Sequence, residues 1–169
     1  MNYISHYDSP LGGITLGSDG EALTLLLFDS EKYFEEMLGK KYETKDLPVF
    51  AKAREWLDIY FSGKDPGFIP PIDLKTTPFR KAVCKIMLTI PYGQTMTYGQ
   101  IAEMIAAQRG IARMSAQAVG GAVGHNPISL IIPCHRVVGS NGSLTGYGGG
   151  LDKKAALLKL EGVDMGRNE

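Results

Sequence analysis

The run Pro133-Cys134-His135-Arg136-Val137 places one thiol directly beside an imidazole and a guanidinium. A free thiol has a pKa of about 8.5 and reacts as a nucleophile only where a base or a positive charge favours the thiolate. His135 and Arg136 are groups of these two kinds. Because adjacent side chains diverge on helices and strands, a turn or a bridging water has to link His135 to Cys134. The run indicates a nucleophilic cysteine; the alternative is an inert, buried one.

The segments around this run have to position Cys134 in a pocket. The apolar stretch 128–132 predicts a buried segment that ends at the thiol. Earlier in the chain, Thr77 before Pro78 predicts the start of a helix, because threonine caps and proline tolerates the first helical position. Cys84 lies inside that helix among apolar neighbours, which favours a packed, unreactive thiol.

Two short helices are predicted ahead of the cysteine. Thr97 and Gln100 form a capping box for a helix over 98–106, and Ser115 caps a second over 116–123. With Gly110 between them, the pair resembles a helix-turn-helix, an outline that many ordinary helix pairs share. The second helix consists mostly of small residues, which suits close backbone approach to DNA or, alternatively, close packing within the protein. Those residues are Ala116, Ala118, Gly120, Gly121, Ala122 and Gly124.

The two halves of the chain differ in charge. Residues 1–74 contain 7 Lys+Arg and 13 Asp+Glu, a net charge of −6, whereas residues 75–169 contain 11 and 5, a net charge of +6. A basic half attracts phosphate backbones, although the asymmetry is also compatible with the two halves attracting each other. The positive half is the one that contains the cysteine run.

The N-terminal half predicts a small α+β domain without evident chemistry. Strands are expected over 3–6, 13–16 and 22–28, joined by hairpins. Ser30 is expected to cap a helix over 31–38, and a second helix is expected over 49–61, where Trp56, Leu57 and Tyr60 have helical spacing. The proline-rich stretch 66–71 predicts an extended linker.

Composition excludes several classes. Neither a long apolar segment nor a signal-peptide pattern is present in the 169 residues, so we expect a cytoplasmic protein that does not enter a membrane. Two cysteines make a disulfide framework improbable. His6, His125 and His135 are dispersed, and no cysteine has a partner at a ligand spacing, so neither a metal nor another cofactor is expected.

Further motifs accompany the cysteine run, and together they resemble the O6-alkylguanine-DNA alkyltransferases, also called methylated-DNA-protein-cysteine methyltransferases. The resemblance covers residues 76–165 in detail. The motifs in that range are Ile90-Pro91-Tyr92-Gly93, Thr97-Tyr98-Gly99-Gln100, Ala118-Val119-Gly120-Gly121-Ala122, Asn126-Pro127, Tyr147-Gly148-Gly149-Gly150-Leu151 and Glu161-Gly162.

The resemblance implies roles for individual residues. Cys134 would accept the alkyl group irreversibly, His135 would act as its base through a water, Glu161 would orient His135, and Tyr98 would donate to the departing guanine. Substrate-binding roles fall to the remaining matches. These are the carbonyls of Cys134 and Val137, the pocket wall Tyr147, Gly148 and Gly149, and Asn126, which would brace the turn before the cysteine segment.

The resemblance also implies that the second helix enters the minor groove while the alkylated nucleotide is flipped out of the stack. The implied DNA contacts are Ala116, Gln117, Ala118, Gly120, Gly121, Arg113 and Arg136. Family members usually have an arginine where this chain has Gln117, which lacks the charge and stacking of a guanidinium.

The fold implied is α+β: a ribonuclease H-like domain over 1–74 and a mostly helical domain with the helix-turn-helix over 75–169. The implied partner is double-stranded DNA containing O6-alkylguanine, bound by a monomer, and O4-alkylthymine is a possible second lesion. Some relatives hold zinc in the N-terminal domain, but this chain has no cysteine there.

Three other functions compete with alkyl transfer. A non-catalytic sensor of flipped lesions would have another residue in place of Cys134. A helix-turn-helix transcription factor would need longer side chains for base readout. A cysteine hydrolase would need a substrate cleft beside the thiol rather than a DNA-binding helix.

Overall fold

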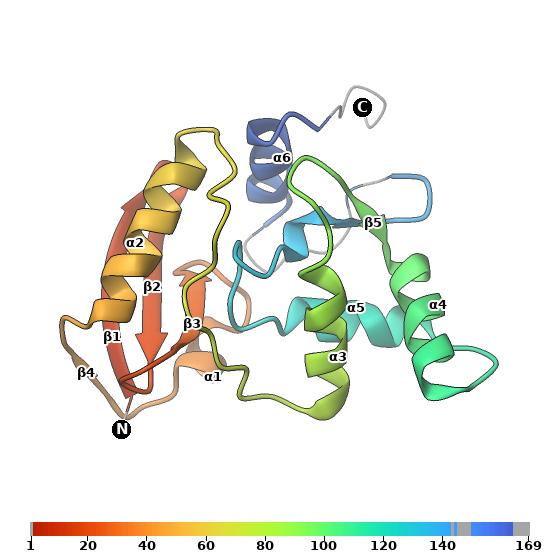
Figure 1. The fold of residues 1–169 in the computed structure, drawn as a ribbon, viewed down its shortest axis with the longest axis horizontal. Helices are drawn as coiled ribbons and strands as arrows, with labels where there is room; N and C mark the ends of the chain where they lie inside the picture. Colours follow the sequence, from red (N-terminus) through yellow and green to blue (C-terminus); the bar gives the residue numbers. More distant parts are fainter. Residues whose placement is uncertain (1, 143, 145–149, 164–169) are drawn as a thin grey trace. The chain divides into compact units, whose positions relative to one another are not determined.

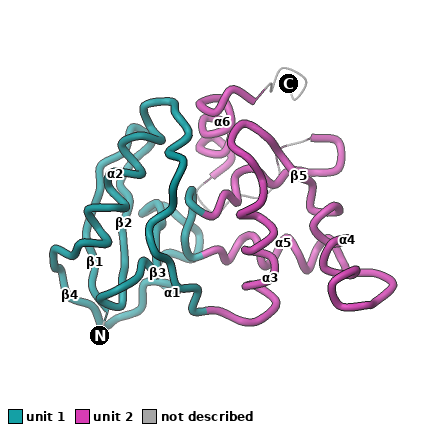
Figure 2. Tube along the Cα trace, viewed as in Figure 1, with its two compact units in different colours: residues 1–75, 127–131 teal, residues 76–126, 132–169 magenta. Residues whose placement is uncertain are grey.

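The computed structural model describes residues 2–142, 144 and 150–163. It divides into two compact units, shown in different colours in Figure 2. The first comprises residues 1–75 together with 127–131, and the second comprises 76–126 together with 132–169. The excursion of residues 127–131 into the first unit is a feature that the predicted division into 1–74 and 75–169 does not include.

A four-stranded mixed sheet forms the first unit (Figure 1). The order is β3-β2-β1-β4, with β1–β2 and β2–β3 antiparallel and β1–β4 parallel. This confirms the three predicted strands and their hairpins. The strands are β1 (Asn2–Ser9), β2 (Gly12–Ser18), β3 (Leu23–Phe28) and β4 (Tyr42–Thr44).

Helix α2 (Pro48–Phe61) packs against this sheet and confirms the helix predicted over 49–61, and its Trp56, Leu57 and Tyr60 are buried. Helix α1 differs from its prediction: it spans Phe34–Leu38 and begins after Tyr33, with no side-chain cap from Ser30. Glu31, the first residue of the predicted helix, is instead buried outside the helix, where it accepts a 2.9 Å hydrogen bond from the distant Ser129.

The proline-rich stretch is extended, as predicted, but its end is part of the first unit. The Leu23 amide donates to the Pro71 carbonyl (2.8 Å), and Ile72 forms an isolated parallel bridge with Leu23. Beyond it, the Leu26 amide donates to the Pro127 carbonyl and the Ser129 amide to the Leu26 carbonyl. Strand β3 therefore binds both segments that connect the two units.

Helices α3 (Pro78–Met87), α4 (Tyr98–Arg109) and α5 (Ala116–Gly124) pack together in the second unit. The three caps predicted for this unit are present: Thr77 accepts from Arg80, Thr97 and Gln100 form the capping box, and Ser115 accepts from Ala118. The helices α4 and α5 with Gly110 between them form the predicted helix-turn-helix outline. Among the described residues, every helix falls short of the length and apolar character that a membrane crossing requires.

In the sequence, the segment that contains Cys134 lies between α5 and the last helix, α6. A short 3₁₀ helix, η1, covers Cys134–Arg136, and strand β6 (Val137–Val138) follows and pairs in parallel with β5 (Met96–Thr97). Helix α6 spans Leu151–Leu160. Because β5 directly precedes α4, the β5–β6 pairing joins the start of α4 to the segment that contains Cys134.

Candidate functional site

Cys134 lies at the start of η1 and is 5% exposed, after a stretch that is buried as predicted. The Ile132 carbonyl accepts 2.8 Å hydrogen bonds both from the Cys134 amide and from Asn126 Nδ2. Asn126 is itself buried, so it ties the end of α5 to the residue that precedes Pro133.

The carboxylate of Glu161 gathers four donors around it. Oε2 accepts from His135 Nε2 (2.6 Å) and Arg136 Nη2 (3.1 Å), while Oε1 accepts from Arg136 Nε (2.8 Å) and the Gly93 amide (2.9 Å). The Glu161 side chain is fully buried. A buried carboxylate with this many donors is held in one orientation, and it holds its partners in turn.

The protonation of this cluster follows from its environment. Burial lowers the pKa of His135, even though the neighbouring Glu161 carboxylate acts in the opposite direction. Burial by itself would raise the pKa of Glu161, but hydrogen bonds from His135 and Arg136 lower it to about 2. A neutral imidazole that donates from Nε2 to an ionised Glu161 has its basic lone pair on Nδ1. An imidazole in this tautomer can accept a proton at Nδ1.

Arg136 was predicted to contact DNA, and in the structure its guanidinium is directed into the protein. It is 8% exposed, and besides Glu161 its Nη1 donates to the Ile90 carbonyl at 2.7 Å. Its guanidinium carbon also lies 5.7 Å from the centre of the Tyr92 ring. Arg136 has its donors engaged inside the protein, where the bidentate pair with Glu161 compensates for its desolvation.

Gly93 is a residue whose role sequence reasoning did not identify. Its φ is +80°, and a Cβ atom there would lie 3.2 Å from the backbone oxygen of Glu161. The position thus needs glycine both for its backbone conformation and for the close approach that lets its amide reach Glu161. The turn sequence Pro91-Tyr92-Gly93 was the available signal.

Lys154 was also missed. It is fully buried on α6, and its Nζ lies 5.7 Å from the centre of the Tyr98 ring. Burial lowers its pKa to about 8, whereas electrostatic attraction to Cys134 raises it. The signal was its spacing, since Lys154 shares the apolar face of the helix with Leu157 and Leu158.

Tyr98 is the first residue of α4 and is half-buried. A Cβ atom on Gly120 of α5 would lie 4.0 Å from the Tyr98 ring, so the two helices meet there. Val137 is buried in β6, and its amide donates to the Cys134 carbonyl. Cys134, His135, Glu161, Arg136, Tyr98 and Lys154 thus belong to one connected part of the second unit.

The other predicted residues fall into three groups. Ala116, Gln117, Ala118, Gly121 and Arg113 are exposed on α5 or the turn before it. Cys84 is fully buried, and burial raises the pKa of its thiol to about 12, as expected of an unreactive cysteine. The predicted pocket wall, Tyr147, Gly148 and Gly149, lies outside the described residues.

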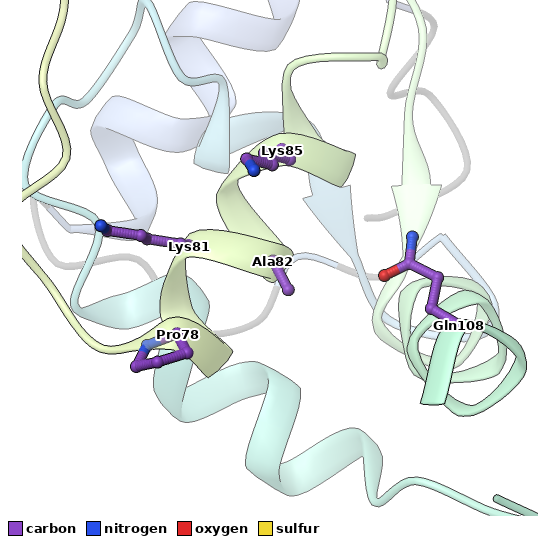
Figure 3. A pocket seen from close by; sticks show the side chains of 5 residues that line it. All are labelled: Pro78, Lys81, Ala82, Lys85 and Gln108. Atoms are coloured by element: carbon purple, nitrogen blue, oxygen red, sulfur yellow. The ribbon is translucent and has the colours of Figure 1, made fainter. Parts of the chain in front are cut away.

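A surface pocket lies apart from the predicted site residues, between α3 and α4 (Figure 3). Pro78, Lys81, Ala82 and Lys85 of α3 and Gln108 of α4 line it. The described residues contain no cluster of histidine, cysteine and carboxylate side chains able to hold a metal ion.

Comparison with known proteins gives matches along the chain. Residues 2–74 match the ribonuclease-like domain of 6-O-methylguanine DNA methyltransferase, and residues 78–163 match its DNA-binding domain. The methylated-DNA–protein-cysteine methyltransferase of Mycobacterium tuberculosis is 45% identical over 159 residues, 92% of each chain. That of Haemophilus influenzae is 41% identical over 162 residues, 95% of this chain and 87% of the relative.

Solved structures match as well. The crystal structure of Mycobacterium tuberculosis OGT in complex with DNA aligns with a TM-score of 0.82 at 43% identity, covering 94% of this chain and 92% of that one. Together with the matching ribonuclease-like domain, this confirms the predicted α+β fold class.

Proposed function

This chain belongs to the 6-O-methylguanine DNA methyltransferase family, and from that premise we propose that it repairs DNA by taking the alkyl group of O6-alkylguanine onto Cys134. The transfer is stoichiometric and irreversible, because a thioether is a poor leaving group. The observation that supports the proposal is a buried Cys134 followed directly in η1 by His135, whose Nε2 is hydrogen-bonded to the buried Glu161 carboxylate at 2.6 Å.

In the proposed reaction, His135 Nδ1 removes the Cys134 proton through a bridging water. The thiolate attacks the alkyl carbon, so that an S–C bond forms as the C–O6 bond breaks and guanine takes the electron pair. The Tyr98 hydroxyl donates a proton to the leaving guanine and regains one from the protonated His135 by way of solvent. Glu161 holds the imidazole in the tautomer that this sequence requires.

Lys154 supports the same step electrostatically. The attraction between its ammonium and Cys134 is mutual, so it favours the thiolate. Lys154→Met keeps the volume and removes the charge, and we expect it to slow transfer at least about tenfold. Because the pKa of Lys154 is about 8, the wild-type rate should decline as pH rises past that value, and the variant should lack this decline. Single-turnover rates between pH 6.5 and 9.5 test both; an unchanged rate would remove Lys154 from the mechanism.

Substrate binding is assigned to the residues around the thiol. The carbonyls of Cys134 and Val137 accept from the exocyclic amine of guanine, and Tyr147, Gly148 and Gly149 form the pocket wall. Asn126 acts indirectly, since its bond to Ile132 steadies the segment before Cys134.

The partner is double-stranded DNA that contains the lesion, and α5 is the element that approaches it. Gly120 and Gly121 let backbone come close to the duplex, with Ala116, Gln117, Ala118 and Arg113 alongside. At Gly121, a Cβ atom would have no neighbour within 4 Å among the described residues, so packing within the second unit does not require glycine there. This favours the close approach of DNA, rather than packing within the protein, as the reason for glycine at position 121.

A Gly121→Ala variant should therefore change stability and DNA binding in opposite directions. In a helix interior, alanine is better than glycine by about 0.5–1 kcal/mol, so the free energy of unfolding should rise. The added methyl group should weaken binding to duplex DNA by about tenfold, because it holds the helix away from the backbone of the duplex. Urea unfolding and fluorescence anisotropy measure the two effects. An affinity equal to that of wild type would rule out close approach at Gly121.

The decisive experiment mixes the protein at equimolar ratio with duplex DNA that contains one O6-methylguanine and determines the intact and peptide masses. We expect one added methyl group on the peptide containing Cys134 and none with undamaged DNA. Tight binding without a mass change would instead favour a damage sensor. The presence of the Cys134 thiol makes this the weaker alternative.

The protein is proposed to act as a monomer in the cytoplasm. Sedimentation tests the oligomeric state, and cell fractionation tests the location.

A further inference from the structure

The stretch from Ala107 to Ala118 comprises the last residues of α4, the turn after it and the first residues of α5, and it is exposed at every position except the half-buried Met114. It contains Arg109 and Arg113 and no carboxylate. Helix α5 itself has no charged side chain. Since duplex binding depends on cations that neutralise phosphates, the cations for this face have to come from outside α5.

The turn after α4 is ordered by its own backbone. Gly110 adopts the left-handed conformation with φ +64°, and the Ile111 amide donates to the Ala106 carbonyl at 3.0 Å. In such a helix end, the apolar residue after the glycine commonly packs on the preceding turn. Ile111 instead remains 45% exposed. The turn thus presents a branched apolar side chain to solvent on a fixed backbone.

Arg109 and Arg113 lie two residues before and two residues after Ile111 in the sequence. The Arg109 guanidinium carbon lies 5.2 Å from the centre of the Phe79 ring of α3, which holds the end of α4 against that helix. Gln108, the residue before Arg109, lines the pocket of Figure 3 together with Lys81 and Lys85. The basic character therefore continues from the turn onto α3, and Arg113 continues it toward α5.

We propose that the α4–α5 turn is a second DNA-contacting element, in which Ile111 wedges against a base step in the minor groove and Arg109 and Arg113 bind the phosphates beside it. Apolar wedges flanked by cations are a common way to unstack and kink a duplex. This inference rests on the proposed function and deepens it, because it names the residues that help to open the stack around the flipped nucleotide.

The test compares Ile111→Ser with Ile69→Ser, a matched control, since Ile69 is 51% exposed and lies in the first unit. Each variant is reacted with duplex DNA containing O6-methylguanine and with the free O6-methylguanine base, which needs no unstacking. We expect Ile111→Ser to slow the duplex reaction by about tenfold and to leave the free-base reaction unchanged. Ile69→Ser should change neither.

Binding to undamaged duplex is measured in parallel, because it does not depend on alkyl transfer. Arg113→Gln should weaken it and reduce the salt dependence of the binding constant by about one ion. Equal duplex rates and affinities for the Ile111→Ser and Ile69→Ser variants would overturn the proposal, as would equal losses on duplex and free base. If the wild-type protein bound duplex through the turn but transferred nothing, the proposed function would fail and the DNA-contacting turn would stand.

Discussion

Replacing Cys134 by serine should abolish alkyl transfer while leaving lesion binding within about twofold of wild type. The hydroxyl of serine is a far weaker nucleophile than a thiolate at neutral pH, so the rate should fall at least about a thousandfold. The substitution is nearly isosteric in a buried site, which preserves the surroundings that bind DNA. Peptide mass after incubation with methylated duplex measures the first effect, and anisotropy with the same duplex measures the second.

Cys84→Ala is the matched control for that experiment. Cys84 is fully buried and the pKa of its thiol is raised to about 12, so it remains protonated. We expect the transfer rate of Cys84→Ala to stay within about twofold of wild type, with a stability loss of about 1 kcal/mol from the small cavity. Transfer that survived in Cys134→Ser and was lost in Cys84→Ala would reverse the assignment of the nucleophile.

Glu161→Gln should lower both the rate of alkyl transfer and the free energy of unfolding. Glutamine retains the shape but not the charge that compensates the buried Arg136, and loss of one partner of a buried ion pair costs about 3–5 kcal/mol. It also replaces one of the two accepting oxygens with an amide NH₂ group, which donates rather than accepts. The His135 and Arg136 donors can then no longer all be satisfied and the His135 tautomer is no longer fixed, so the transfer rate should fall by about 10²–10⁴-fold. Glu103→Gln, an exposed position on α4, makes the same charge change as a control and should leave both quantities unchanged.

The pH dependence of stability gives this prediction a second readout. The folded pKa of Glu161 is about 2 against an ordinary value of 4.5, so its stabilising effect is complete above pH 4.5 and is lost as pH falls toward 2. His135, whose folded pKa is lowered by burial, opposes folding increasingly as pH falls below 6.5. The free energy of unfolding of the wild type should therefore fall on acidification. In Glu161→Gln, the fall that occurs below pH 4.5 should be smaller than in the wild type. Urea titrations at pH 7, 5.5, 4 and 3 measure this; parallel curves for the two proteins would contradict the assigned role.

Local sequence signals determined the elements of this protein. The caps at Thr77, Thr97 and Ser115 and the alternation of the first strands depend on residues within one turn or one hairpin, and each is present in the structure. The capping of a helix by Ser30 was wrong, because the burial of Glu31 against Ser129, 98 residues away, outweighed the local preference.

Sequence alone also singled out Cys134, because a thiol between apolar residues and a His-Arg pair is a local pattern. Only the tertiary structure decided what surrounds it. Arg136 turned inward to Glu161 rather than outward to DNA, Gly93 donated to the same carboxylate, and Lys154 was buried on α6. Arg136 and Gly93 are 25 and 68 residues away from Glu161 in the chain. Burial and charge pairing depend on which distant segments pack together, and that is decided by the free energy of the whole core rather than by any one stretch of sequence.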